Sequence, residues 1–80
     1  MMSAFVLIQI AVSGGLDDMR ALHDALHAVD GVKTVHFLAG PTDVIAFVEA
    51  ADQEALGESL GKIRSVDGVA STDTRIVWPM

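Results

Sequence analysis

Two short polar segments of this 80-residue chain carry side chains that could hold a small zwitterion. In the first, Gly40-Pro41-Thr42-Asp43, the carboxylate of Asp43 is an acceptor for an ammonium group. The second, Ser71-Thr72-Asp73-Thr74, supplies hydroxyls that donate or accept hydrogen bonds. An amino acid needs both kinds of partner: an anion for its ammonium, and N–H or O–H donors for its carboxylate. From spacing alone, however, the first segment is better interpreted as an ordinary turn, with Pro at its second position and Gly at its bend.

Two histidines lie at i and i+4 in the segment His23-Asp24-Ala25-Leu26-His27. This spacing resembles the HExxH zinc motif, with Asp in place of Glu. A catalytic zinc needs a third protein ligand, and the remaining histidine, His36, lies on another predicted element at a distance that the sequence does not set. The pair also borders the apolar stripe of its own helix. We therefore interpret the two as boundary histidines, and the sequence predicts no metal site.

Nucleophilic or acid–base catalysis has little support in this sequence. The chain has no Cys and no Tyr, and no Ser stands in a Gly-x-Ser-x-Gly turn. The alternative is a small cofactor-free enzyme of the dimeric α/β-barrel type, which would need a polar constellation inside a sheet-lined cavity. Only Gln9, His36 and the threonines near the last strand could supply it. The sequence therefore predicts a non-enzymatic protein without a cofactor.

An internal repeat organises the elements that carry these residues. Val29-Asp30-Gly31-Val32 recurs 37 residues later as Val66-Asp67-Gly68-Val69. Each copy follows a helical pattern and leads into a strand-like run, and a further strand lies upstream of each helix, at 4–12 and at 44–49. Each half of the chain therefore reads strand, helix, strand.

The two helices are predicted from apolar residues at steps of three and four. In the first half these residues are Leu16, Met19, Leu22, Leu26 and Val29, and in the second half Leu56, Leu60, Ile63 and Val66. Asp52 is the expected N-cap of the second helix. Gly57 and Gly61 inside that helix should each cost about 1 kcal/mol relative to Ala, which suggests close backbone packing on their shared face.

The strand patterns predict a four-stranded sheet. Both faces of 4–12 and 44–49 are apolar, so these are expected to be central strands, whereas 32–38 and 70–78 carry polar residues typical of edges. A βαββαβ chain with the first and third strands central is the ferredoxin-like plait, an α+β fold in which two helices cover one sheet face. Nothing in the chain is left to cover the other face, so we expect dimerisation through the sheets.

Composition narrows the class of protein further. Five basic and eleven acidic residues give a net charge of −6, and 51% of the residues are hydrophobic. This excludes a disordered chain and disfavours direct nucleic-acid binding, which needs clustered Lys and Arg. A chain this short usually needs disulfides, a bound metal or a partner in addition to its core to be stable. Because the chain has no cysteines and a high fraction of hydrophobic residues, self-association is favoured. No targeting or membrane-spanning segment is recognised, so we expect a single domain over residues 1–80 in the cytoplasm.

Together these landmarks resemble the ligand-binding domain of the Lrp/AsnC family, also called the RAM domain, without its DNA-binding half. The resemblance covers nearly the whole chain and depends on the order and spacing of several segments. These are Ala4-Phe5-Val6-Leu7-Ile8, Asp30-Gly31-Val32, Gly40-Pro41-Thr42-Asp43-Val44-Ile45, Lys62-Ile63-Arg64, Val66-Asp67-Gly68-Val69 and 71–77.

The resemblance implies sheet-paired dimers that form an α/β barrel, rings of such dimers, and small effectors, typically amino acids, bound between dimers. Carried over residue by residue, the effector site comprises Gly40, Asp43, Ser71, Thr72 and Thr74. Asp43 would accept the ammonium, and backbone N–H groups near Gly40 with the hydroxyls of Thr72 and Thr74 would take the carboxylate. Thr42 departs from the family, in which this position is often aromatic. The missing helix-turn-helix implies regulation by co-assembly with full-length relatives.

Overall fold

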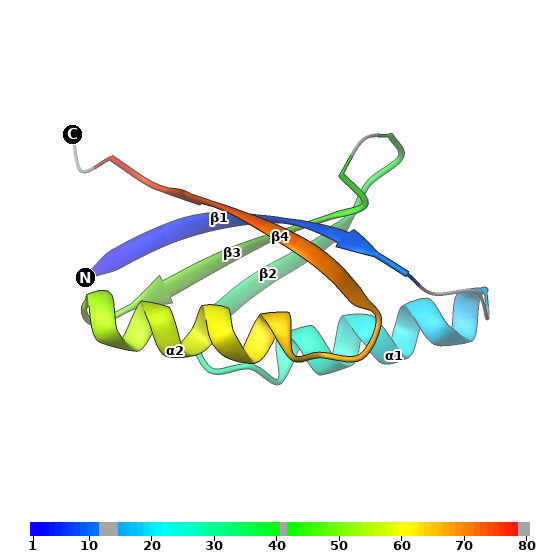
Figure 1. Cartoon of the computed structure of the whole chain (residues 1–80), viewed down its shortest axis with the longest axis horizontal. Coiled ribbons are helices and arrows are strands. Elements are labelled where there is room, and N and C mark those ends of the chain that lie inside the picture. The colour runs from blue at the N-terminus through cyan, green and yellow to red at the C-terminus, as the bar shows by residue number, and fades with distance from the viewer. Residues whose placement is uncertain (12–14, 41, 79–80) are drawn as a thin grey trace.

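The protein folds into the predicted succession of strands and helices. The computed structural model describes residues 1–11, 15–40 and 42–78, so Pro41 of the polar turn lies outside the described residues. The elements follow the order strand, helix, strand, strand, helix, strand. They are β1 (Met2–Ile10), α1 (Leu16–His27), β2 (Val32–Phe37), β3 (Val44–Ala50), α2 (Gln53–Arg64) and β4 (Val69–Ile76). Both helices lie against the same face of the sheet (Figure 1).

The sheet has the strand order β2-β3-β1-β4, and its three strand pairs are antiparallel. The predicted central strands, β1 and β3, pair from Met2 opposite Ala50 to Ile8 opposite Val44. The predicted edges are confirmed as well, with β2 beside β3 and β4 beside β1. This order is the βαββαβ ferredoxin-like plait, confirming the predicted fold class.

The core lies between the helices and one face of the sheet. Alternate residues of the central strands point into it, because successive side chains of a strand face opposite sides. Its fully buried aliphatic side chains are Val6, Ile8, Val44 and Val48 from the strands and Leu26 and Ile63 from the helices. Burying each such side chain contributes about 1.5–3 kcal/mol.

The helical stripes are confirmed apart from Leu16 and Met19 at the beginning of α1, which lie outside the core. Leu22, Leu26, Leu56 and Ile63 are buried, but Leu16 is 65% exposed. Leu16 is the first residue of α1 and borders a groove with Met19, Arg20, His23 and Phe37, outside the core. No helix of the described residues is long and apolar enough to span a membrane.

The beginning of α2 is also as predicted, but the two glycines inside this helix are not packed. The side chain of Asp52 accepts a hydrogen bond from the backbone N–H of Ala55 (2.9 Å), which confirms the N-cap. A Cβ at Gly57 or Gly61 would meet no other atom within 4 Å. The expected close backbone packing is therefore wrong, because this face of α2 borders open space.

The internal repeat is visible in the backbone of the two Asp-Gly turns. Gly31 has φ 95° and Gly68 has φ 97°, a left-handed conformation that favours glycine. The carbonyl of Gly31 accepts from the N–H of Glu49, and the carbonyl of Gly68 accepts from the N–H of Ala11, both at 2.8 Å. Each helix is thus followed by the same turn, and a backbone hydrogen bond joins that turn to the end of a central strand.

Candidate functional site

Asp43 fastens the β2–β3 connection to the end of β1. Its carboxylate Oδ2 accepts a hydrogen bond from the backbone N–H of Ile10 at 3.0 Å. Its backbone N–H donates to the carbonyl of Ile8 (3.1 Å), and its carbonyl accepts from the N–H of Leu38 (2.8 Å). The side chain is half-buried. One carboxylate oxygen therefore has a structural role, while Oδ1 makes no hydrogen bond within the described residues.

The loop before Asp43 is open and carries an unusual backbone conformation. Gly40 has φ 124°, and a Cβ there would meet nothing within 4 Å. Thr42 has φ 67° and is the one non-glycine residue with positive φ in the described part of the chain. Because β-branched residues seldom adopt this region, the conformation stores local strain of order 1–3 kcal/mol. Such strain is concentrated at functional sites in many proteins, so it marks this loop as a candidate site.

The three predicted hydroxyls lie on β4 but face different sides of the sheet. Ser71 is opposite Gln9, and its Oγ donates to Gln9 Oε1 at 3.2 Å on the face without helices. Thr72 is opposite Ile8 and Thr74 opposite Val6, so both share the side of these core residues and are half-buried. The predicted set is therefore divided between the two faces of one edge strand.

The structure nevertheless brings most of the predicted set to one end of the sheet. Ile8 is paired with Val44 on one side and with Thr72 on the other, so Asp43 and Thr72 flank the same end of β1. Two strand spacings separate β3 from β4, or about 10 Å between their backbones. Thr74 lies two residues further along β4, away from this end. Gln9, through its bond to Ser71, is the residue of this end that the predicted site did not include.

The face without helices is apolar in its centre and polar along its edges. Phe5 and Leu7 of β1 and Ile45 and Phe47 of β3 form the centre, which we call the open face. The rings of Phe5 and Phe47 have centroids 5.0 Å apart, and Phe5 is 43% exposed. Isolated exposed apolar residues are common, but a contiguous cluster of this kind indicates an interaction surface.

An ion pair on β4 borders the open face. The guanidinium of Arg75 donates three hydrogen bonds to Asp73, the shortest one 2.9 Å from Nη2 to Oδ2. Asp73 is opposite Leu7, and Arg75 is opposite Phe5. The hydrogen bonds from Arg75 lower the pKa of the Asp73 carboxyl, and the pKa of the Arg75 guanidinium is raised in return. Asp73 is thus held as a carboxylate paired with Arg75 on the exposed surface of β4.

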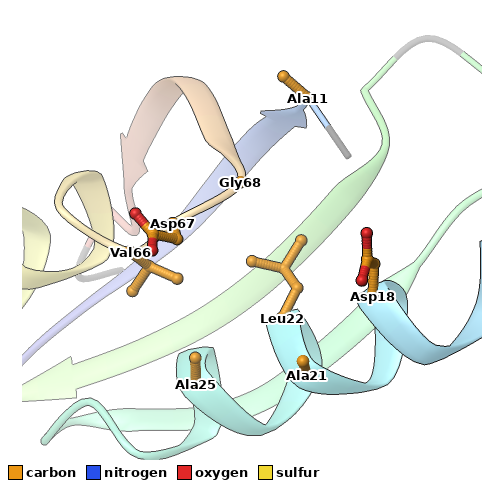
Figure 2. Close-up of a pocket in the computed structure, with 8 residues that line it drawn as sticks. All are labelled: Ala11, Asp18, Ala21, Leu22, Ala25, Val66, Asp67 and Gly68. Atoms are coloured by element: carbon orange, nitrogen blue, oxygen red, sulfur yellow. The ribbon is translucent and has the colours of Figure 1, made fainter. Parts of the chain in front are cut away.

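A further cavity, open to solvent, lies elsewhere. Its volume is about 470 Å³. Figure 2 shows that it lies between α1 and the turn that joins α2 to β4. Its lining residues are Ala11, Asp18, Ala21, Leu22, Ala25, Val66, Asp67 and Gly68. None of the predicted site residues borders it. This cavity and the loop around Asp43 are separate features of the molecule.

The alternative catalytic residues do not come together. His36 lies on β2, opposite Ile45 of β3. Gln9 lies on β1, opposite Ser71 of β4. The strand β3 therefore lies between the strands that carry His36 and Gln9. Within the described residues, no group of three or more His, Cys, Asp or Glu side chains could hold a metal ion.

Comparison with known proteins decides the family. Residues 3–78 match the model of the Lrp/AsnC ligand-binding domain. The chain belongs to the Lrp/AsnC ligand-binding domain family. This confirms the resemblance drawn from the sequence.

Curated relatives support the family assignment and show what share of a longer protein this chain matches. The chain is 33% identical over 75 residues to an uncharacterised HTH-type transcriptional regulator of Pyrococcus furiosus, covering 92% of this chain and 49% of the relative. The chain thus spans about half the length of the curated regulators that it matches. A 52-residue part is 40% identical to a segment of homocitrate synthase from Sulfurisphaera tokodaii, covering 65% of this chain but only 11% of that enzyme. That segment is too small a share of the enzyme to indicate catalysis here.

Solved structures agree over the whole chain. The protein TTHA0845 from Thermus thermophilus has a TM-score of 0.83 at 31% identity, covering 100% of this chain and 96% of the other. A hypothetical protein from Pyrococcus horikoshii, PHS023, has a TM-score of 0.83 at 28% identity, covering 100% and 93%. A transcriptional regulator from Neisseria meningitidis, solved as a complex with L-Met, has a TM-score of 0.82 at 20% identity, covering 98% and 50%. The last of these supports the fold alone.

Proposed function

We propose that this Lrp/AsnC domain binds an amino acid or a related small zwitterion at the Asp43 end of the sheet and responds through self-assembly. The observation that carries the proposal is that Asp43 and Thr72 flank the same end of β1, one on each side of it. The complex of the Neisseria meningitidis regulator with L-Met is consistent with this ligand class.

The geometry suggests how the ligand would be held. Asp43 Oδ2 is engaged by the N–H of Ile10, so the other oxygen, Oδ1, would accept the ligand's ammonium. The hydroxyl of Thr72 and N–H groups of the open Gly40 loop would donate to the ligand's carboxylate. Thr74 and Ser71 are less directly placed, because one is further along β4 and the other faces the opposite side of the strand. Asp43 and Thr72 are thus the pair on which recognition would depend most.

The open face supplies the assembly part of the proposal. Phe5, Leu7, Ile45 and Phe47 are covered by no element of the described chain, and a second copy would cover them with the same patch, since a twofold interface is self-complementary. The resulting dimer is the sheet-paired α/β barrel expected from the family. Rings of dimers would then bring further chains against the open Gly40 loop. A ligand that binds only the assembled form would shift the equilibrium toward it.

The proposal also includes the proteins that would respond to ligand-dependent assembly of this domain. The curated relatives are HTH-type regulators about twice as long as this chain, and they share the domain type. Co-assembly through the shared open face would let this domain alter the oligomeric state of such relatives in the cytoplasm. The domain would then regulate transcription without contacting DNA itself.

A thermal-shift screen over the twenty amino acids tests the ligand class. We expect at least one amino acid at millimolar concentration to raise the Tm, because a ligand that binds only the native state stabilises it by mass action. The stabilisation at 100 times the Kd would be about 2.7 kcal/mol. Glycinamide and acetate, which carry only one of the two charges each, serve as controls and should have no effect. A flat response to all twenty amino acids would contradict the proposal.

A further inference from the structure

We propose a second, independent site: the imidazoles of His23 and His27 on α1 form a two-ligand chelate for a late first-row divalent ion such as Zn²⁺, Ni²⁺ or Cu²⁺. The site lies on α1, on the helix side of the sheet, and shares no residue with the Asp43 site or with the open face. It is not a closed zinc centre of three or four protein ligands, since no group of three or more His, Cys, Asp or Glu side chains is found within the described residues. Water or a second molecule would fill the remaining positions.

The first observation is the position of the two rings. Residues four apart lie one above the other on a helix, and the ring centroids of His23 and His27 are 4.6 Å apart with a 59° angle between the ring planes. Imidazole nitrogens bind Zn²⁺ at about 2.0–2.1 Å. Two rings at this separation and tilt can therefore direct one nitrogen each at a shared ion after small side-chain rotations.

The second observation concerns the nitrogen that would bind. Nδ1 of His23 lies 3.4 Å from Oδ1 of Asp24, close enough for Nδ1–H to donate a long hydrogen bond. A proton on Nδ1 leaves Nε2 as the free lone pair. Metal-bound histidines commonly donate their other ring N–H to a carboxylate, which fixes the tautomer and raises the basicity of the ligand. Asp24 is therefore a positioning residue for this site.

The third observation is that the helix holds both ligands in place. Leu22 and Leu26, each immediately before one of the histidines, are buried at 3% and 0% exposure. His23 also packs beside Phe37 of β2, with ring centroids 6.2 Å apart. The His23 side chain is nevertheless 43% exposed, and His27 is exposed. The helix that carries the two imidazoles is thus anchored by the core, while the imidazoles themselves are accessible to an ion from solvent.

Isothermal titration of the tag-free, metal-stripped protein with Zn²⁺, Ni²⁺, Cu²⁺ and Mg²⁺, each alone, tests this site. We expect saturable binding of the three late ions, tightest for Cu²⁺, and none of Mg²⁺, which prefers oxygen ligands. His23→Ala and His27→Ala should each weaken binding by at least about tenfold, because even the loss of an outer-shell partner costs roughly 10–100-fold. Asp24→Asn should give a smaller loss.

Two matched variants distinguish a chelate from general histidine binding. His36→Ala removes the one histidine outside the pair and should leave the affinity unchanged. The double variant His27→Ala, Ala28→His keeps the number of histidines but moves the second ring to i+5, off the shared face, and should bind as weakly as His27→Ala. Zn²⁺ should also shift the imidazole NMR signals of His23 and His27 but not of His36. Binding that survives the double variant, or that falls with His36→Ala, would overturn the proposal.

Discussion

Replacing Leu7 with Glu is expected to convert the proposed dimer into an 8.4 kDa monomer at micromolar concentration. Leu7 lies in the centre of the open face, between Ile45 on β3 and Asp73 on β4. A Glu there would add a negative charge to the centre of the proposed interface, next to Asp73, and Arg75 on the same strand is already paired with Asp73.

The expected effect is large because the interface would use the same patch twice. An uncompensated buried charge costs about 3–5 kcal/mol, and each protomer contributes one. The dissociation constant should therefore rise by more than about 100-fold. In the isolated protomer the same side chain can reach water, so the fold should persist, which circular dichroism would check.

Leu16→Glu is the matched control for this substitution. Leu16 is 65% exposed but lies at the start of α1, on the opposite side of the sheet from the open face. Sedimentation velocity should find it as dimeric as the unaltered protein. If Leu7→Glu also stays dimeric, or if the unaltered protein is a monomer, pairing through the open face is wrong.

Gly31→Ala is expected to destabilise the fold by roughly 3 kcal/mol, a large single-residue effect. Two independent costs contribute. The first is the positive φ of 95°, which costs an L-residue about 1–2 kcal/mol. The second is steric: the new Cβ would lie 2.8 Å from the carbonyl oxygen of Glu49 and 3.0 Å from Oγ of Ser59.

Neither neighbour of Gly31 can readily move. The N–H of Glu49 donates to the Gly31 carbonyl at 2.8 Å, and Oγ of Ser59 donates to the Asp30 carbonyl at 2.6 Å. Gly15→Ala separates the two costs, because Gly15 has φ 73° but nothing within 4 Å of a Cβ. Urea unfolding at one protein concentration should find Gly31→Ala the more damaging. Equal losses for the two variants would mean that the turn is not tightly packed against β3 and α2.

Most of the fold follows from the sequence because local patterns and global topology agree. The repeat of Val-Asp-Gly-Val predicted two equivalent turns, and Gly31 and Gly68 have nearly equal positive φ angles. The two-sided apolar character of β1 and β3 predicted that they are central, since only paired, covered strands need apolar residues on both faces. Gly57 and Gly61 misled the prediction, because spacing shows that two glycines share a face but not what lies opposite that face.

The candidate site was less predictable, since it depends on relations between strands. The sequence indicated the carboxylate of Asp43, but the hydrogen bond from the Ile10 N–H joins residues 33 positions apart. The hydroxyls of Ser71 and Thr72 are adjacent in the chain yet face opposite sides of the sheet, as strand alternation requires. The hydrogen bond between Ser71 and Gln9 depends on the register between β4 and β1, which no local pattern specifies.

Calorimetric titration of an amino acid into Asp43→Asn tests the central claim most directly. The amide oxygen of Asn can still accept from the Ile10 N–H, so the fold should be kept, while the negative charge that would bind an ammonium is lost. Asp30→Asn is the control, because Asp30 is an exposed carboxylate before β2, at the opposite end of the sheet. With the amino acid that raises the Tm most, we expect Asp30→Asn to bind like the unaltered protein and Asp43→Asn to bind at least about tenfold more weakly, as for a charge-assisted hydrogen bond of about 1.5–3 kcal/mol. Undiminished binding by Asp43→Asn would contradict recognition of the ligand at this end of the sheet.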